Sequence, residues 1–301
     1  HIRALLAPWI LHTGLGPEAN FSGPMNRLIA FSLESVGMPI VKGGSSNLVQ
    51  AFVGLIEECG GSLTTNSHVS QILVESGVAI GVAVEGQDNV YATRAVICNV
   101  TPNQLYEHLL EPQWVPDKIL QQATSYIYGR AGMQIHLALR NTPQWLQQSL
   151  NDVPMVHVSD GVDSVSKAVN QAERGLLPDQ ATIVVAQPTA VDPSRAPEGH
   201  SILWIQLQEL PSVIKGDAAG VIPAPEDGAW NDQIKEAYAD RIIERLCDYI
   251  PSLKANILHR EVLSPADLQA MNINLVGGDP YSGHCGMQQF LFWRPLRSLS
   301  N

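Results

Sequence analysis

The stretch GMPIVKGGSSNLVQAFVGLIEECGG, residues 37–61, has the pattern of an extended segment, a tight turn and a helix. Pro39 favours an extended chain, because a residue that precedes a proline avoids the helical region. Gly43 and Gly44 allow a sharp reversal of the backbone. The apolar residues that follow recur at helical spacing, and a second glycine pair ends the pattern. We therefore expect an extended segment, a two-glycine turn and a helix over 46–59.

The next residues predict β-structure. Apolar side chains alternate strictly over 78–84, after a turn and an apolar run that contains Val69. A further apolar run at 95–98 predicts a last strand that is buried on both faces. The sequence thus predicts a β-meander over 62–98, packed beside the preceding helix.

The chain beyond residue 102 mixes helical and strand-like runs. Apolar residues at helical spacing predict an amphipathic helix that starts near Trp230 and ends at Pro251. Shorter helices are expected at 103–110 and 116–125. Strands are expected at 132–140, 154–158, 181–187, 201–208 and 257–263.

Composition limits the class of protein. The 301 residues are 45% hydrophobic and 16% charged, against about 25% charged in an ordinary soluble protein, so a large core is expected. The length suggests two domains. A net charge of −11 argues against nucleic-acid binding. The sequence contains no run of about 18 uncharged apolar residues, which is the length that a membrane-spanning helix needs. The four cysteines form no CxxC pair, which argues against a zinc site and favours a reducing compartment. No metal is expected.

Residues 14–19, GLGPEA, fit the GxGxxA variant of a dinucleotide-binding loop, and Glu34 follows at nearly the right distance. However, Pro8 interrupts the strand that should come first, and Glu34 lies within a helical pattern. An ordinary loop is therefore the better interpretation. The sequence has no other GxGxxG and no GxxxxGK[ST], so it shows no phosphate-binding loop.

Histidine and cysteine give little support for nucleophilic or metal catalysis. The sequence has no HExxH and no GxSxG. His136 falls in an alternating strand, where structural packing is the expected role. His284 and Cys285 are adjacent, so in an extended segment their side chains point to opposite faces. No catalytic acid or base can be assigned.

Several segments, taken in order, resemble the phytoene dehydrogenase family. This family contains FAD-dependent carotenoid desaturases, isomerases and ketolases as well as retinol saturases, and it belongs to the amine-oxidase-like flavoproteins. The resemblance covers about residues 1–297. It is carried by 37–44, 95–99, DPSRAPEGH at 192–200, SPADL at 264–268, and the glycine pair, Gln288 and Arg-Pro pair within 277–295.

The resemblance implies a mixed α/β (α+β) fold. Part of a FAD-binding, amine-oxidase-like domain would be interleaved with a substrate domain of mixed β-sheet and helices. Residues 1–39 would belong to the substrate domain, 40–102 to the FAD-binding domain, 103–285 to the substrate domain, and 286–301 would start the return to the FAD-binding domain.

The resemblance also implies where FAD would be contacted. Family members have an N-terminal GxGxxG and a C-terminal FAD segment that this sequence does not show, so we expect the 301-residue chain alone to bind FAD weakly or not at all. The implied contacts are Val69 at the adenine, Asn99, Thr101 and Pro102 at a strand end beside the dinucleotide, and Gly43 and Gly44 near the flavin.

The implied function is that of a FAD-dependent oxidoreductase acting on a hydrophobic isoprenoid or lipid-like substrate. Hydride transfer with the flavin would desaturate, saturate or isomerise that substrate. The expected partner is a hydrophobic small molecule and not a nucleic acid, in the cytoplasm or at a peripheral membrane contact, and the oligomeric state is left open. Two alternatives are a flavin amine oxidase-like enzyme and a non-catalytic module that binds apolar ligands or a protein partner.

Overall fold

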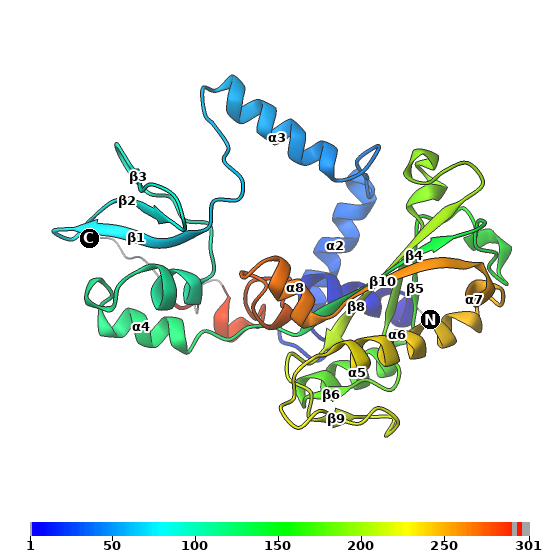
Figure 1. Cartoon of the computed structure of the whole chain (residues 1–301). Helices are drawn as coiled ribbons and strands as arrows, with labels where there is room; N and C mark the ends of the chain where they lie inside the picture. Colours follow the sequence, from blue (N-terminus) through cyan, green and yellow to red (C-terminus); the bar gives the residue numbers. More distant parts are fainter. Residues whose placement is uncertain (1, 291–293, 297–301) are drawn as a thin grey trace. The chain divides into compact units, whose positions relative to one another are not determined.

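The protein is described by a computed structural model that covers residues 2–290 and 294–296. The chain forms two compact units (Figure 1). Unit 1 comprises residues 1–48 and 129–286, and unit 2 comprises residues 49–128 and the residues from 287 onward. These boundaries differ from the predicted ones at 39 and 102, and the assignment of the segments to cofactor and substrate domains stays a prediction. The predicted return segment 286–301 lies partly outside the described residues.

Unit 1 is built on a five-stranded sheet with the strand order β10-β4-β8-β7-β5. Every neighbouring pair in this sheet is antiparallel. All five strands were expected from the sequence to within a few residues. They are β4 (Ala131–Leu139), β5 (Met155–Val158), β7 (Ile183–Ala186), β8 (Ser201–Leu210) and β10 (Ile257–Leu263).

One face of this sheet forms the main hydrophobic core. Alternate side chains point to opposite faces of a strand. In β4 from residue 133 onward, the buried side chains are those at odd positions: Met133, Ile135, Leu137 and Leu139. Helix α6 (Asp232–Cys247) packs on this face through Tyr238 and Ile242. Its first turn is capped by Asn231, whose side chain accepts a hydrogen bond from the Ile234 amide. The predicted amphipathic helix is confirmed.

The remaining elements of unit 1 surround the sheet. Helix α5 was not expected from the sequence, and α8 begins with a capping box formed by Ser264 and Asp267. The α-helices are α1 (Ile2–Leu6), α2 (Ser22–Val36), α5 (Val162–Glu173), α7 (Leu253–Asn256) and α8 (Pro265–Met271), and the short strands β6 (Leu176–Leu177) and β9 (Gly216–Asp217) form a parallel pair. The 3-10 helices are η1 (Ala7–Thr13), η4 (Gln148–Leu150), η5 (Pro188–Ala190), η6 (Pro193–Arg195) and η7 (Val276–Gly278).

Unit 2 contains the expected β-meander. Strands β1 (Val69–Glu75), β2 (Val78–Val84) and β3 (Val90–Tyr91) form an antiparallel sheet in that order. Ser76 and Gly77 have positive φ angles of 53° and 81°, as a two-residue hairpin turn requires. The other elements are α3 (Ser46–Glu58), which begins in unit 1, a π-helix η2 (Gln104–Leu109), the 3-10 helices η3 (Pro112–Trp114) and η8 (Met287–Gln289), and α4 (Asp117–Thr124).

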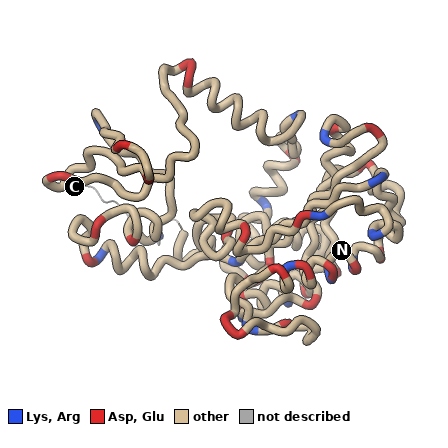
Figure 2. The backbone as a smooth tube through the Cα atoms, viewed as in Figure 1, with Lys and Arg blue, Asp and Glu red and all other residues tan. Residues whose placement is uncertain are grey.

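Two expectations for this region are wrong. Residues 95–98 form no strand, and the Ile97 side chain is 92% exposed. A strand exists only through hydrogen bonds to a neighbour, and no strand among the described residues pairs with this segment. Helix α3 is not packed on the meander, because it has no buried residue and Phe52 is 59% exposed. Its only charged residues lie at its C-terminal end (Figure 2). Its apolar side chains are exposed, as Val49 at 61% and Leu55 at 53% show.

A single buried carboxylate organises the C-terminal part of unit 1. Asp279 is 0% exposed, and its oxygens accept hydrogen bonds from the backbone amides of Gly129 at 2.7 Å, Tyr281 at 2.8 Å and Gly283 at 2.8 Å. Gly129 directly precedes the segment that enters β4, so Asp279 fastens the loop after η7 to the start of the central sheet.

We expect the substitution Asp279→Asn to lower the free energy of unfolding by about 3 kcal/mol, because the new NH2 group faces a backbone donor and leaves it unsatisfied. Urea unfolding followed by circular dichroism measures this change. Asp227→Asn is the matched control, since the exposed Asp227 accepts from the Ala229 amide and its substitution should change stability by less than about 0.5 kcal/mol. Equal effects of the two substitutions would contradict a special role for Asp279.

Candidate functional site

A cavity of about 650 Å3 lies over one face of the five-stranded sheet, and we call it the sheet pocket. Gln134 and His136 of β4 and Trp204 of β8 line it. These residues occupy even positions, whereas the core side chains of the same strands occupy odd positions, so the sheet pocket lies on the face opposite to α6. Its volume is typical of sites for small molecules, which measure about 300–1,000 Å3.

An extended segment forms one wall of the sheet pocket. Residues 38–41, which carry part of the family resemblance, line the pocket together with Ser45. The segment is extended as predicted, but it belongs to no sheet. It leads directly into the turn at Gly43 and Gly44.

The turn is held by a residue 149 positions away in the sequence. Asp192, which is 6% exposed, accepts a hydrogen bond from the Gly43 amide at 2.6 Å. The Ser194 hydroxyl donates to the other carboxylate oxygen at 2.6 Å. The bond from the Ser194 hydroxyl is the largest cause that holds the pKa of Asp192 below its usual value. The bond from the Gly43 amide is the next largest. The loop at 192–195 therefore fixes the wall of the pocket.

The two glycines have the backbone geometry that the sequence suggested. Gly43 has a φ of 78° and Gly44 a φ of 117°, in a region that other residues rarely adopt. The guanidinium of Arg195 lies 3.6–3.7 Å from the place of a Cβ at position 44, which is an ordinary contact. A side chain at 44 would thus be strained by the backbone and not by a clash. A contact of either glycine with a flavin stays a prediction.

Polar side chains gather on the floor of the sheet pocket. The Trp204 indole donates to Gln134 Oε1 at 3.3 Å, and His136 Nε2 lies 3.2 Å from the same oxygen. An indole N–H is only a donor, so it fixes the orientation of the Gln134 amide. Gln134 Oε1 can only accept, and His136 Nε2 therefore carries the hydrogen. Burial lowers the pKa of His136, while the charge of Glu261 opposes this shift, so the imidazole is neutral at pH 7.

The expected role of His136 was structural packing, and the structure places it at the pocket. Its side chain is exposed and faces the pocket. Strand periodicity alone could not decide which face of the sheet was covered, although the alternation of Gln134, His136 and Ala138 did show that they share a face.

The other residues implied for the cofactor lie in unit 2. Val69 begins β1 and pairs with Val84. Thr101 is buried, and its hydroxyl donates to Asn103 Oδ1 at 2.8 Å, where the Tyr128 hydroxyl also donates at 2.7 Å. Asn99 is exposed and Pro102 follows Thr101 before η2. The structure brings Asn99, Thr101 and Pro102 into one segment, while Gly43 and Gly44 belong to unit 1.

The residues of unit 2 partly fit a dinucleotide. Residues 95–99 pair with no described strand, and Asn99 is exposed, so backbone and amide groups are available to bind a ribose or an adenine. Residues 14–21 contain turns and follow the 3-10 helix η1, with no strand before them, which confirms that the GxGxxA match is an ordinary loop.

A pair of histidines that the sequence did not suggest lies on the same face of the sheet. His12 Nε2 and His157 Nε2 are 2.8 Å apart, and His12 Nδ1 lies 3.4 Å from the Gln208 amide nitrogen. Burial, followed by the proximity of His12, lowers the pKa of His157 to about 4, and burial lowers that of His12. Both rings are neutral at pH 7 and join η1 to β5.

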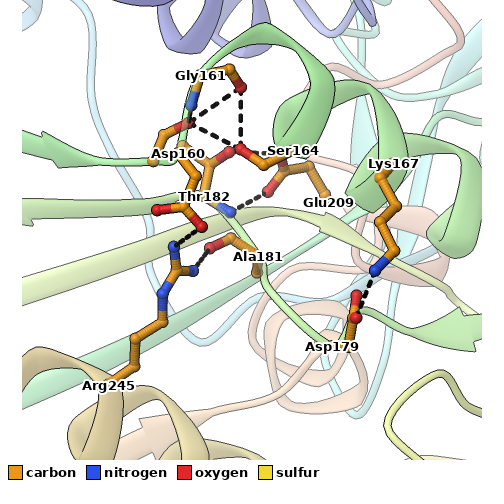
Figure 3. A network of polar contacts seen from close by, with 10 residues as sticks. Asp160, Gly161, Ser164, Lys167, Asp179, Ala181, Thr182, Glu209 and Arg245 are labelled. Carbon is orange, nitrogen blue, oxygen red and sulfur yellow. Dashed lines mark hydrogen bonds and ion pairs between the residues drawn. The ribbon is translucent and has the colours of Figure 1, made fainter.

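A buried carboxyl group lies at the end of β8, in a network of polar contacts (Figure 3). Glu209 is 0% exposed and accepts hydrogen bonds from the Thr182 amide at 2.9 Å and the Thr182 hydroxyl at 2.7 Å. Arg245 donates to the Ala181 carbonyl and pairs with Asp160 at 3.7 Å. Burial raises the pKa of Glu209 to about 7, although the bonds from Thr182 oppose this shift.

The chain belongs to the family described as flavin containing amine oxidoreductases, whose profile matches residues 13–264. It is 27% identical over 301 residues to the zeta-carotene-forming phytoene desaturase of Myxococcus xanthus, covering 98% of this chain and 52% of the relative. It is 25% identical over 266 residues to the rat pyridine nucleotide-disulfide oxidoreductase domain-containing protein 2, covering 85% and 44%. It is 24% identical over 282 residues to the zebrafish (Danio rerio) all-trans-retinol 13,14-reductase, covering 91% and 45%.

The fold is also similar to a solved structure. An oxidoreductase from Methanosarcina mazei superposes with a TM-score of 0.51 at 19% identity, covering 87% of this chain and 51% of that protein. The mixed α/β fold of a flavoprotein and the resemblance to phytoene dehydrogenases are thereby confirmed. The chain spans about half the length of the curated relatives it matches.

Two further findings apply to residues 2–290 and 294–296. No helix there is both long enough and apolar enough to cross a membrane. No group of three or more His, Cys, Asp or Glu side chains there could hold a metal ion.

We expect Gly44→Ala to lower the free energy of unfolding by about 1–2 kcal/mol through backbone strain. Thermal or urea unfolding measures the change. Gly23→Ala is the control within the same unit, because Gly23 lies in α2 with open space around it, and alanine there should be neutral or slightly stabilising. An unchanged stability of Gly44→Ala would show that the turn tolerates a side chain.

We expect Glu209→Gln to become more stable relative to the wild type as the pH rises from 5 to 8. Glu209 has a folded pKa of about 7 against a usual value of 4.5, so the folded state holds a proton that the unfolded state has lost. Stability therefore falls as the pH rises through this window, by at most about 3 kcal/mol for this group. The histidine pair has the opposite pH dependence and cancels in the difference between the two proteins. Urea unfolding at pH 5 and pH 8 measures the difference in the free energy of unfolding between the two proteins. The same difference at both pH values would contradict the raised pKa of Glu209.

Proposed function

We propose that this chain provides the substrate-binding part, and a portion of the cofactor domain, of an FAD-dependent oxidoreductase that acts on a hydrophobic isoprenoid or lipid-like substrate. The observation that carries the proposal is the sheet pocket. Its size suits a small molecule, and its walls include residues 38–41, Ser45 and Arg195, which belong to or directly follow segments that carry the family resemblance. Membership of the flavoprotein family supports an oxidoreductase.

The apolar character of the walls supports a hydrophobic substrate. Ile40 of the extended segment, Met155 of β5 and Ile202 of β8 all line the pocket. Burial of apolar substrate surface against such walls gives about 25 cal/mol per Å2. Two of the relatives are named for a carotene-forming desaturation and for the reduction of a retinol.

The flavin is proposed to be FAD. Val69, Asn99, Thr101 and Pro102 would hold it, and a bound flavin would supply the hydride acceptor or donor. The residues of the sheet pocket would bind and orient the substrate and exclude water. FAD binding by this chain alone is still expected to be weak.

The first alternative, an amine oxidase-like enzyme, is less well supported. An amine substrate needs a polar or aromatic enclosure for its ammonium group. Trp204 and Glu261 line one part of the pocket, but the wall around Ile40, Met155 and Ile202 offers only apolar contacts. The second alternative, a non-catalytic module, would use the same pocket and differs only in lacking a bound flavin.

We expect the purified chain to bind the C20 isoprenoid alcohol geranylgeraniol, and Ala186→Trp to abolish binding because the indole would fill the pocket that Ala186 lines. Calorimetric titration with ligand delivered from cyclodextrin measures the affinity. Val221→Trp is the control, because Val221 is 76% exposed and does not line the sheet pocket. Stronger binding of putrescine than of geranylgeraniol would favour the amine alternative.

A further inference from the structure

We propose that the sheet pocket selects a ligand with a neutral hydroxyl or carbonyl group at one end, which Gln134 and His136 bind, and that it disfavours a plain hydrocarbon. This inference rests on the proposed function, because it specifies the chemistry of the same substrate. It depends on how polar and apolar side chains are distributed over the sheet.

The strand order separates the two kinds of side chain. The polar residues stand on β4 and β10, at one edge of the sheet, and include Gln134, His136, His259 and Glu261. The apolar residues on the other side of Trp204 stand on β7 and β5. Neighbouring strands are about 4.8 Å apart, so β4 and β7 are separated by roughly 10 Å. The pocket therefore has a polar end and an apolar end.

The register places the polar groups close together. His136 lies opposite Trp204 on one side and opposite Glu261 on the other. The Gln134 amide oxygen already accepts from Trp204 and from His136 Nε2. Among the described residues, no acceptor is bonded to the Gln134 NH2 group and no donor to His136 Nδ1. Gln134 and His136 are two residues apart on β4 and share the face that lines the pocket. One donor and one acceptor without a protein partner therefore lie on neighbouring side chains.

A hydroxyl group can satisfy both. It accepts from the Gln134 NH2 group and donates to Nδ1 of neutral His136, and a carbonyl satisfies the first. A hydrocarbon would displace the water from both groups and could not replace the hydrogen bonds that this water makes. The loss of these bonds would lower the affinity of the hydrocarbon. Sites built to hydrogen-bond a hydroxyl reject analogues that lack it for this reason.

The charge at this end disfavours an acidic ligand. Glu261 is paired with His136 across the strands, and its carboxylate would repel a second one. Arg195 also lines the pocket, and its guanidinium lies beside the Gly44 turn. A carboxylate ligand would therefore place its charged end at Arg195 and not at His136.

The test compares three C20 probes on the wild-type chain: geranylgeraniol, the hydrocarbon with the same double bonds but no hydroxyl, and the corresponding carboxylic acid. We expect the alcohol to bind about tenfold more tightly than the hydrocarbon, equivalent to about 1.4 kcal/mol. The hydrophobic effect alone predicts the reverse order. The acid should bind more weakly than the alcohol.

Two variants test the residues. Gln134→Met and His136→Phe should each reduce the ratio of alcohol to hydrocarbon affinity, and the double variant should bring it to about one. Met155→Ala, at the apolar end, should weaken both ligands equally. Circular dichroism melting shows that each variant is folded, and the comparison on the wild type needs no variant.

The outcomes distinguish the two proposals. Equal binding of alcohol and hydrocarbon by the wild type would overturn the polar end group and leave the isoprenoid pocket intact. A ratio that persists in the double variant, or an acid that binds most tightly, would overturn the assignment to Gln134 and His136. Binding of none of the three probes would overturn the proposed function as well.

Discussion

The pairing of β4 with β8 is the constraint on which unit 1 depends. These two strands lie at the centre of the five-stranded sheet, and their register decides which side chains face α6 and which face the pocket. The same alternation that places Ile135 and Ile205 in the core places His136 and Trp204 on the other face. A shift of one residue would exchange the two sets. The core and the binding surface are therefore specified by one set of backbone hydrogen bonds.

The sequence was sufficient for elements whose pattern is local. The alternation of apolar residues from Val78 to Val84 predicted β2, and helical spacing after Trp230 predicted α6, because each sequence pattern repeats within the element itself. The prediction of a strand at residues 95–98 was wrong for a complementary reason. A run with apolar side chains on both faces forms a buried strand only if neighbouring strands pair with it. No strand among the described residues pairs with this one.

The site was predictable in its parts and not in its assembly. The glycine turn and the segment at 192–195 were both recognised, but nothing in either showed that Asp192 binds the amide of Gly43. The buried Glu209 and the pair of His12 and His157 gave no signal, since each depends on a partner far away in the sequence. Contacts of this kind follow from topology, which a single sequence does not contain.

The long-range bonds of unit 1 have a consequence for the order of events on the ribosome. The Tyr281 hydroxyl donates to the carbonyl of Leu11, 270 positions earlier. The Gly43 amide likewise has its acceptor only after Asp192 has been synthesised. The meander of unit 2 joins only neighbouring strands and can close as soon as it emerges. At about 5–20 residues per second, the N-terminal segments of unit 1 remain without these partners for roughly 10 to 50 seconds. Unit 2 can therefore complete its sheet before unit 1 gains these bonds.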